Sequence, residues 1–497
     1  YEIAQCLVGS EMCIRDREDS LKNKTIKGAW WSFAENFLGQ GISFFTGLIL
    51  ARILCPSEYG LIGIITIFIN VFNAIVDSGF SSALIRNNNT EDDDYGTMFI
   101  VNMLVSVFLF CVLFVSAPAI SVFFHSSELI SLCRVMGLIV IINATAIIQN
   151  TYLSKQLDFK TKTKASLISS TVSGGVGITM AYCGFGVWSL VSQQIVRQLL
   201  NSISLWIFSK YKVQLRFSQN KFKKMWRFGW KILLSSIIYS VWNELTQIVI
   251  GRYYSPSTLG YYTRANQFSC IFSSNLTTVV QRVSYPVLSK IQDDNIRLKN
   301  NYQSIIKITM FITFILMIGM TACSKSVILV LLGEKWMECV MFLRLICLSM
   351  MLYPLNALNL TMFEVKGHSD LYLKVELVKK GVLIIPIVLG IFINIYWMLS
   401  ANIVCSLLCY FVNAYYSGRL INYKISEQLK DLLPSFFLAV TMGTILFCMD
   451  SFVDLSPLLL LFTEIMFGGI FVMSLAQLFK LPEFIEIMQI IKHFILK

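Results

Sequence analysis

The stretch ARILCPSEYG, residues 51–60, places an arginine, a proline, a serine and a glycine directly after an apolar run of membrane-spanning length. The stretch GRYYSPSTLG, residues 251–260, repeats this pattern 200 positions later. Trp30 and Trp230 keep the same offset at the other end of that apolar run. Repetition on this scale is typical of transporters built from two homologous halves around a central site. The pattern therefore predicts an internal duplication.

The composition predicts an all-α polytopic membrane protein. The chain has 497 residues, of which 56% are hydrophobic and 14% charged, and its mean hydropathy is +0.66. Soluble domains carry about 25% charged residues. The apolar runs are continuous rather than alternating, which favours membrane-spanning helices over the strands of a β-barrel.

We expect about fourteen transmembrane helices, and loop charge orients them. The expected spans are residues 30–50, 61–83, 95–117, 129–152, 165–183, 187–208, 230–251, 260–281, 303–322, 337–362, 375–393, 395–417, 432–449 and 457–478. Lysine and arginine concentrate on one side of these spans, and the loops on the other side contain only Arg52, Arg252, Lys325 and Lys335. The positive-inside rule then predicts a multi-pass membrane protein with both termini in the cytoplasm.

The repeat also predicts how the spans are grouped. Arg134 and Arg344 are 210 residues apart, as are Lys164 and Lys374, so the repeated unit comprises six spans. Two copies in the same orientation are related by a pseudo-two-fold axis along the membrane normal. The expected regions are an N-terminal six-helix lobe at 20–208, a basic cytoplasmic interlobe linker at 209–229, a C-terminal six-helix lobe at 230–420, and two additional helices with a cytoplasmic tail at 421–497.

The first nineteen residues are set apart from the fold. Residues 6–17 read CLVGSEMCIRDR, which resembles translated sequencing-adapter sequence. We therefore interpret residues 1–19 as a non-native segment and expect the native protein to begin near Ser20 or Leu21.

The net charge of +12 is carried mainly by membrane-flanking loops. This distribution favours contact with anionic membrane lipids over nucleic-acid binding. The segment Asn87–Asp94 is acidic and is most simply a solvated cytoplasmic loop. No cysteines form a C-x-x-C pair and the three histidines fall in loops or tails, so we expect neither a metal site nor a cofactor.

Ionisable groups within apolar spans mark candidate water-filled paths or substrate sites, because hydrocarbon solvates them poorly. The candidate substrate-binding residues are Arg52, Arg197, Arg252, Arg264, Asn266 and Gln267. The acidic candidates are Glu35, Asp77 and Glu244. The guanidinium group binds phosphate through paired hydrogen bonds, so the arginines favour an anionic substrate group.

Several of these features have structural alternatives. Asp77 can be a polar group that ends a helix, and Arg134 and Arg344 can extend to the interface. Arg52 and Arg252 can either anchor helices or line the outer mouth of a cavity. Gly174, Gly175 and Gly177 lack the flanking residues of a phosphate-binding loop and favour close helix packing.

Further motifs resemble those of the multidrug/oligosaccharidyl-lipid/polysaccharide exporter superfamily, and most closely its polysaccharide repeat-unit flippases of the colanic-acid and teichuronic-acid exporter branch. The similarity covers nearly all of the chain after Leu21. The motifs are Leu50–Leu54 with Pro56–Gly60, Asp77–Phe80 with Ala83–Arg86, Arg282–Ser289, and Leu331–Trp336.

The resemblance implies a fourteen-helix flippase rather than an enzyme. Such proteins move undecaprenyl-pyrophosphate-linked oligosaccharides across the membrane by alternating access, for O-antigen, capsule or exopolysaccharide biosynthesis. The arginines would then contact the pyrophosphate. Glu35, Asp77 and Glu244 would pair with them or bind a coupling ion from an H⁺ or Na⁺ gradient. Polysaccharide polymerase machinery would be a partner.

Three alternatives remain open at this point. A cation-coupled multidrug antiporter of the same superfamily would suit a cavity dominated by carboxylates and aromatic rings. A lipid-linked peptidoglycan-precursor flippase is the second alternative. A membrane polysaccharide polymerase or ligase is the third, although such chemistry is expected to need a sizeable outer loop.

Overall fold

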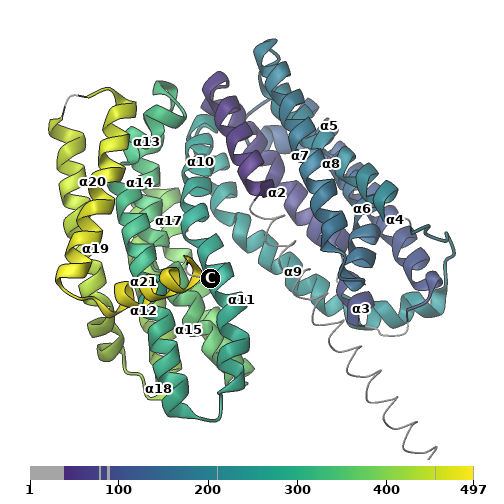
Figure 1. The fold of residues 1–497 in the computed structure, drawn as a ribbon. Coiled ribbons are helices and arrows are strands. Elements are labelled where there is room, and N and C mark those ends of the chain that lie inside the picture. The colour runs from purple at the N-terminus through teal and green to yellow at the C-terminus, as the bar shows by residue number, and fades with distance from the viewer. Residues whose placement is uncertain (1–37, 78–79, 87–89, 210, 454, 496–497) are drawn as a thin grey trace, which may run out of the picture. The chain divides into compact units, whose positions relative to one another are not determined.

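The computed structural model describes residues 38–77, 80–86, 90–209, 211–453 and 455–495. These residues form α-helices and one short 3₁₀ helix, with no strand among them (Figure 1). The expected all-α membrane architecture is therefore confirmed. The chain divides into two compact units, unit 1 at residues 1–252 and unit 2 at residues 253–497.

Unit 1 contains eight labelled helices preceded by an unlabelled one. The first is the apolar helix Leu38–Ile53. The others are α2 (Pro56–Asp77), α3 (Phe80–Arg86), α4 (Asp92–Phe123), α5 (Leu129–Met136), α6 (Leu138–Lys155), α7 (Phe159–Tyr182), α8 (Val187–Phe208) and α9 (Gln219–Tyr253).

Unit 2 begins with α10 and runs to the end of the described chain. Its helices are α10 (Pro256–Phe272), α11 (Ser274–Lys290), α12 (Asn295–Ala322), α13 (Ser324–Leu331), the 3₁₀ helix η1 (Glu334–Trp336), α14 (Cys339–Met350), α15 (Tyr353–Val365), α16 (Ser369–Val382), α17 (Ile384–Phe392), α18 (Ile395–Ile421), α19 (Ile425–Phe452), α20 (Pro457–Leu478) and α21 (Pro482–Ile495).

The two copies of the repeated motif adopt the same local structure. One helix ends at Ile53 and the next begins at Pro56. In the second copy, α9 ends at Tyr253 and α10 begins at Pro256. Proline suits the start of a helix because its fixed φ is helical and its missing N–H would have no partner there. Each copy of the motif thus forms a short break between two consecutive helices.

The first turn after each break is held by a different side chain. Glu58 Oε2 accepts a hydrogen bond from the Cys55 backbone N–H at 2.7 Å. Ser255 Oγ accepts one from the Thr258 backbone N–H at 3.2 Å. Both satisfy backbone donors that a helix start leaves without intrahelical partners.

Nine helices within the described ranges are long and apolar enough to cross a membrane. They are Pro56–Asp77, Asp92–Phe123, Leu129–Lys155, Gly229–Tyr253, Asn295–Ala322, Cys339–Val365, Ile395–Ile421, Ile425–Phe452 and Pro457–Leu478. The other five expected spans correspond to the short helix Leu38–Ile53, to α7 and α8, and to the pairs α10–α11 and α16–α17, which are divided into shorter helices. The count of fourteen stays a prediction.

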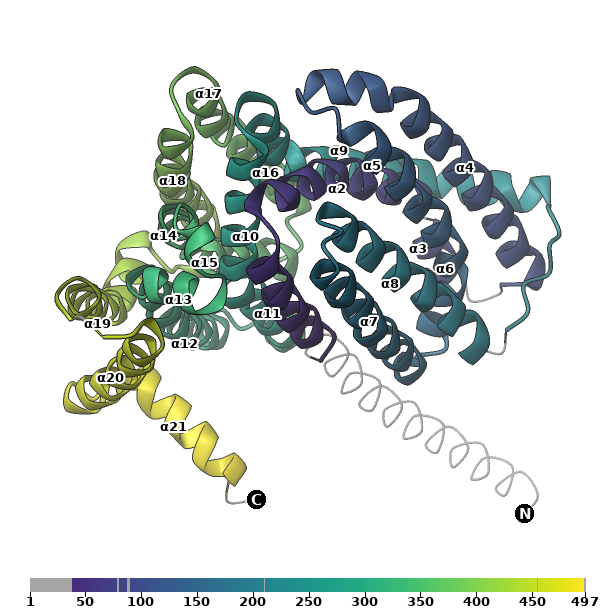
Figure 2. The ribbon, with the colours of Figure 1, turned by 90° about the horizontal axis from the view of Figure 1, so that it is seen from above.

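The glycines of α7 lie where this helix meets its neighbours. A Cβ atom at Gly174 would lie 2.7 Å from Thr46 Oγ1, and one at Gly177 would lie 3.0 Å from Gln193 Cβ in α8. At Gly175 it would meet nothing within 4 Å. Figure 2 shows α7 and α8 side by side. The predicted close packing is confirmed for Gly174 and Gly177, since small residues let helix backbones approach in a membrane.

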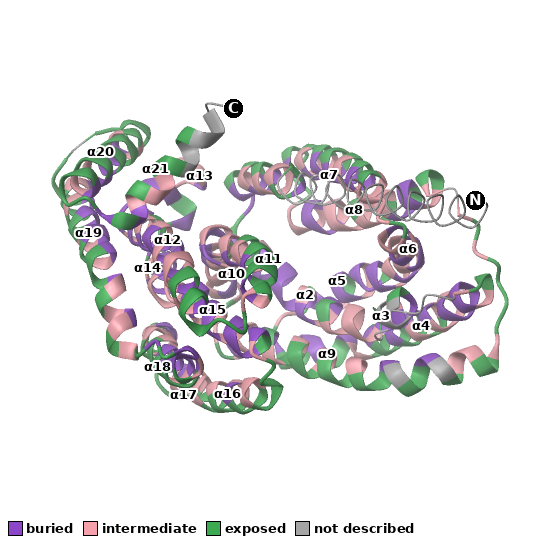
Figure 3. Ribbon diagram, turned by 60° about the horizontal axis from the view of Figure 1, so that its bottom comes forward, coloured by how far each residue is buried: buried purple, intermediate pink, exposed green. Residues whose placement is uncertain are grey.

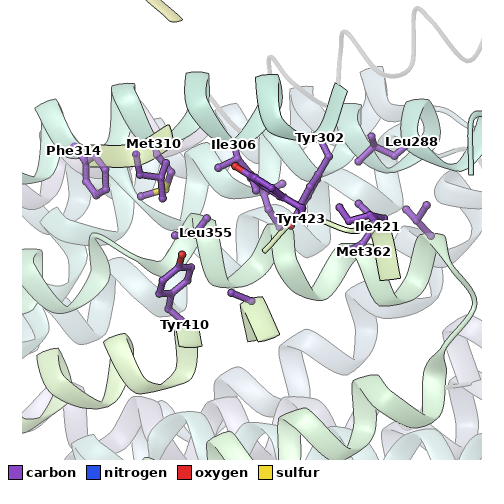
Figure 4. Packing of buried hydrophobic residues seen from close by; sticks show 14 of the residues in the cluster. Leu288, Tyr302, Ile306, Met310, Phe314, Leu355, Met362, Tyr410, Ile421 and Tyr423 are labelled. Carbon is purple, nitrogen blue, oxygen red and sulfur yellow. The ribbon is translucent and has the colours of Figure 1, made fainter. Parts of the chain in front are cut away.

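Unit 2 has a large core between α12, α15, α18 and the start of α19. Tyr302, Tyr410 and Tyr423 are each no more than 1% exposed and pack among aliphatic side chains (Figure 4). The Tyr302 hydroxyl donates to Asn359 Oδ1 at 3.1 Å. Figure 3 shows the contrast between these helices, which have extensive buried faces, and α20, which is largely exposed.

The extended segment between α8 and α9 lies on the start of α4. The Tyr211 hydroxyl donates to Asp92 Oδ1 at 2.8 Å. The Ser218 backbone N–H donates to Thr97 Oγ1 at 3.0 Å. A Cβ atom at Gly96 would lie only 2.0 Å from the Gln214 carbonyl oxygen. The backbone of this segment thus approaches α4 as closely as glycine allows.

Charge reinforces this contact. Lys221 Nζ lies 3.1 Å from Glu91 Oε2 and 3.6 Å from Asp94 Oδ2. The hydrogen bond that the Lys221 ammonium donates to the Glu91 carboxylate is the main cause that raises the pKa of Lys221. Burial, followed by the hydrogen bond to Asp92, raises the pKa of the Tyr211 phenol. The solvated-loop interpretation is therefore wrong for Asp94, which is 4% exposed, because the basic segment covers it.

The boundary between the compact units differs from the predicted linker. It follows Arg252, so residues 230–252 belong to unit 1, although the sequence-based division assigns them to the second lobe. The reason is that α9 continues without a break from the segment held on α4. The division into six-helix lobes stays a prediction, and residues 1–19 lie outside the described residues.

We expect Gly96→Ala to destabilise the purified protein by about 1–3 kcal/mol, because the added methyl group must displace the backbone at Gln214. Thermal unfolding in detergent measures the effect. Gly175→Ala is the matched control, since it adds the same methyl to a helical glycine with open space and should change stability by less than about 1 kcal/mol. Equal stability of the two variants would contradict the close approach.

Candidate functional site

The candidate residues are distributed over both units. Unit 1 contains Arg52, Asp77, Arg197, Glu244 and Arg252, and unit 2 contains Arg264, Asn266 and Gln267. Glu35 lies outside the described residues.

Glu244 of α9 is a buried acidic residue of unit 1 whose hydrogen-bond partners are both neutral. Its side chain is 8% exposed. Asn70 of α2 donates to Oε1 at 2.8 Å and Gln247 donates to Oε2 at 2.7 Å. No lysine or arginine pairs with it within the described part of the chain. The Glu244 carboxyl group therefore has two neutral hydrogen-bond donors and no described cation beside it. A buried carboxyl group of this kind can bind a proton or a small cation.

The amides around Glu244 were not among the residues that the sequence singled out. A second amide contact also involves α2, where the Asn143 side chain of α6 donates to Asn73 Oδ1 of α2 at 2.9 Å. Asn70, Asn73 and Asp77 are spaced by three and four residues, so they lie on one face of α2. This spacing was visible in the sequence. It would have marked a polar stripe along an otherwise apolar helix.

Asp77 is the last residue of α2 and its side chain is exposed. The Ser81 hydroxyl donates to its carboxylate. This local contact fits the interpretation of Asp77 as a polar group at a helix end. A role for Asp77 in ion coupling stays a prediction.

Arg197 is the candidate cation in the middle of a unit 1 helix. It lies at the midpoint of α8, a helix that packs against α2, α6 and α7. Its side chain is exposed, and it forms no hydrogen bond or ion pair with the described residues. A guanidinium placed halfway along a helix of membrane-spanning length needs water or an anion at that depth. Arg197 can therefore offer all of its donors to a ligand.

Arg252 is instead held by its own unit. Its Nη1 donates to the Phe123 carbonyl at the end of α4 and lies 3.0 Å from Nε2 of His125. The guanidinium also lies over the Phe123 ring, 4.7 Å from its centroid. A cation at the C-terminal end of a helix interacts favourably with the exposed carbonyls. These contacts are those of an anchor between α9 and α4.

The preceding residue, Gly251, permits this arrangement. A Cβ atom at Gly251 would lie 3.0 Å from the Phe124 ring. Arg52 occupies the equivalent position of the first motif and is exposed. The structure thus favours anchoring for Arg252. Contact with substrate stays a prediction for both arginines.

Arg264, Asn266 and Gln267 lie on α10 of unit 2. Arg264 Nη1 donates to Gln267 Oε1 at 2.5 Å. Gln267 is exposed, whereas Asn266 and Arg264 are half-buried. The hydrogen bond fixes one edge of the guanidinium and directs it along the helix. This geometry suits an arginine that receives an anion from the exposed side of α10.

A comparison with protein-family models connects these features to known proteins. Residues 49–341, more than half of the chain, match the family described as "Polysaccharide biosynthesis protein". The chain belongs to this family. The resemblance inferred from the sequence motifs is thereby confirmed.

Two named relatives match about two thirds to three quarters of the chain. The chain is 24% identical over 382 residues to the teichuronic acid biosynthesis protein TuaB of Bacillus subtilis, covering 75% of this chain and 78% of that protein. It is 26% identical over 327 residues to the succinoglycan biosynthesis transport protein ExoT of Rhizobium meliloti, covering 66% of each.

Solved structures share the fold of this family member. The lipid II flippase MurJ in an inward closed conformation superposes with a TM-score of 0.73 at 15% identity, covering 91% of this chain and 98% of that chain. An inward-facing multidrug transporter of the MATE family superposes with a TM-score of 0.58 at 16% identity, covering 77% and 98%. At these identities the comparison shows the fold alone.

We expect Arg252→Ala to lower the stability of the protein by about 1.5–3 kcal/mol, because it removes a charged donor from the Phe123 carbonyl. Thermal unfolding measures the loss. Arg227→Ala, an exposed arginine on the same helix, is the control and should unfold like the wild type. An Arg252→Ala protein that unfolds normally but no longer exports polysaccharide would instead make Arg252 a substrate-binding residue.

Proposed function

We propose that the protein is a flippase that moves undecaprenyl-pyrophosphate-linked oligosaccharide repeat units across the cytoplasmic membrane by alternating access, for O-antigen, capsule or exopolysaccharide biosynthesis. The observation that carries the proposal is the family match over residues 49–341. The name of the Rhizobium relative, a biosynthesis transport protein, supports transport rather than enzymatic synthesis. The fold shared with a lipid II flippase supports a lipid-linked substrate.

The chemistry of this substrate requires an exposed cation within the membrane-spanning region. The pyrophosphate carries negative charge that hydrocarbon cannot solvate, while the polyprenyl tail can remain in lipid. Arg197 meets this requirement because it is exposed at mid-helix and has no partner within the described residues. Arg264 is the corresponding candidate in unit 2. We assign pyrophosphate contact first to these two arginines.

The acidic candidates serve a second purpose in this proposal. Glu244 holds a carboxyl between two amide donors and no paired lysine or arginine is described beside it. Such a group can exchange a proton or a sodium ion as the protein alternates between its states. Glu244 is therefore our candidate for coupling to an ion gradient.

Multidrug antiport is the alternative within the same fold. The MATE structure superposes less closely than the lipid II flippase, with TM-scores of 0.58 and 0.73. The family match is to polysaccharide biosynthesis. A peptidoglycan-precursor flippase shares the fold, since lipid II is such a precursor, but the family match favours polysaccharide biosynthesis. A polymerase or ligase finds no specific support in the described contacts.

The proposed orientation places both termini, and the segment between α8 and α9, in the cytoplasm of a bacterial cell. The basic residues of this segment would then lie near anionic lipid at the inner leaflet. Polysaccharide polymerase machinery would receive the exported units on the outer side. The two motif copies, each ending a helix at an arginine-containing turn, support the proposed duplication into six-helix lobes.

Replacing Arg197 tests the substrate site. We expect Arg197→Ala to abolish surface polysaccharide while the protein level stays normal, because the side chain has no structural contact to lose among the described residues. Immunoblotting of polymer and protein in a complemented deletion strain measures both. Arg297→Ala, an exposed arginine in the first turn of α12, is the control and should support normal export. Wild-type polymer in the Arg197→Ala strain would remove this residue from the mechanism.

Cysteine labelling tests the orientation. Lys223→Cys, in the basic start of α9, should react with a membrane-impermeant maleimide only after the cells are opened. Lys335→Cys, in η1, should react in intact cells. Both side chains are exposed, which makes their reactivities comparable. Labelling of Lys223→Cys from outside would reverse the proposed topology.

A further inference from the structure

A charged cluster lies at the end of unit 2 where α12 ends and α14 begins. Arg344 Nη2 of α14 lies 3.7 Å from Asp450 Oδ2 of α19, and Arg344 Nε donates to Ser324 Oγ at 2.8 Å. Ser326 Oγ of α13 lies 3.4 Å from Asp450 Oδ1. Figure 1 shows α13 at the same end of unit 2 as the connection between α19 and α20. Asp450 therefore has an arginine and a hydroxyl as partners.

A second carboxyl group beside this cluster lacks such partners. Glu464 of α20 is 0% exposed, and neither of its oxygens has a hydrogen-bond partner of normal geometry among the described residues. The side chains of Cys323 and Ser326 lie near it, and its charged neighbours are Asp450 and Lys325. Lys325 is half-buried, and the Arg344 guanidinium is already engaged by Asp450.

The position of Glu464 on its helix is also unusual. The buried residues of α20 are Leu460, Glu464, Gly468, Val472 and Ala476, which are spaced by four and form one stripe. Glu464 is the single polar member of this stripe. Its neighbours belong to α13 and α19 and to the turn before α13, and α20 packs mainly against α13 and α19. The carboxyl group is fully buried among these helices, so solvent does not reach it in this conformation.

The energetics of the site favour a neutral carboxyl group. An ionised carboxylate buried without a paired cation or hydrogen bonds costs several kcal/mol. The neighbouring carboxylate of Asp450 adds repulsion between like charges. We propose that Glu464 binds a proton, and that Arg344, Asp450 and Glu464 together form a proton-binding site between α14, α19 and α20. This inference does not depend on the proposed transport function.

The predicted repeat pairs Arg344 of unit 2 with Arg134 of unit 1. The Arg134 guanidinium lies over the Phe114 ring, 4.6 Å from the centroid, and no carboxylate pairs with it among the described residues. Arg344 keeps the aromatic contact, at 5.0 Å from the centroid of Phe447, and gains Asp450. Both acids of the site come from α19 and α20, the helices outside the predicted repeat.

The proton has a defined structural effect. With the proton bound, Glu464 is neutral and α20 can pack its stripe against α13 and α19 in a dry interface. Without the proton, Glu464 adds a second negative charge to an interface where the Arg344 guanidinium is already paired with Asp450. Proton release would therefore weaken the attachment of α20. The packing of the appended helix pair becomes sensitive to pH.

Infrared spectroscopy of the purified protein in lipid nanodiscs tests the site. At neutral pH, the wild-type spectrum minus that of Glu464→Gln should contain the carbonyl band of a protonated carboxyl group. The control is Glu427→Gln, which changes a carboxylate paired with Lys299 at 2.6 Å and should show carboxylate bands only. Carboxylate bands in the Glu464→Gln difference, or loss of the protonated band on adding sodium, would overturn the proposal.

A second measurement keeps the test independent of how well Glu464→Gln folds. Asp450→Asn removes the neighbouring charge and frees Arg344, and both effects stabilise an ionised Glu464. The protonated band should then disappear at a lower pH than in the wild type. An unchanged titration in Asp450→Asn would show that the three residues do not form one site.

The pH dependence of thermal stability is a third test of proton binding at Glu464. Wild-type protein should lose stability as the pH rises and Glu464 releases its proton in the folded state. Glu464→Gln, which mimics the neutral acid, should show a smaller loss over the same pH range. Parallel pH profiles for the two proteins would contradict proton binding at Glu464.

Discussion

Hydrocarbon offers neither hydrogen bonds nor counter-charges, so each polar group within a membrane-spanning helix has to find its partner inside the protein. This constraint explains specific polar contacts between the helices. Glu244 is held by the amides of Asn70 and Gln247. Arg252 is held by the Phe123 carbonyl at the end of α4. Apolar packing against lipid or against another helix differs little in energy, so these polar contacts and the small residues of α7 determine which helices meet.

Arg197 and Glu464 depart from this rule in opposite ways, and we interpret both as ligand-binding groups. Arg197 is exposed and has no partner among the described residues, which suits a cation that meets a mobile anion. Glu464 is fully buried and has no hydrogen-bond partner of normal geometry there, which suits a carboxyl group that holds a proton. Exposure therefore distinguishes the proposed substrate-binding residue from the proposed proton-binding residue.

Much of the local structure can be predicted from short stretches of the sequence. The repeated motif predicted two equivalent positions, and both form a helix end followed by a helix that starts at proline. The glycines of α7 indicated close packing, which the contacts of Gly174 and Gly177 confirm. The acidic turn before α4 was misinterpreted, because its partner, the segment that contains Lys221, lies more than a hundred residues away. No local pattern reports a contact across that distance.

The sequence alone determined the class of the protein, because the amount of apolar surface, the length of its runs and the side of the loop charges are properties of residue order. It also named the charged residues within the spans. Only the tertiary structure decided which contacts these charges make. Both Arg252 and Arg197 are candidate substrate-binding residues in the sequence. In the structure, Arg252 is held by the Phe123 carbonyl, whereas Arg197 is exposed and unpaired among the described residues. Their difference arises from which helix ends and side chains lie beside them, and hydrophobic periodicity specifies which face of a helix is buried but not its neighbour.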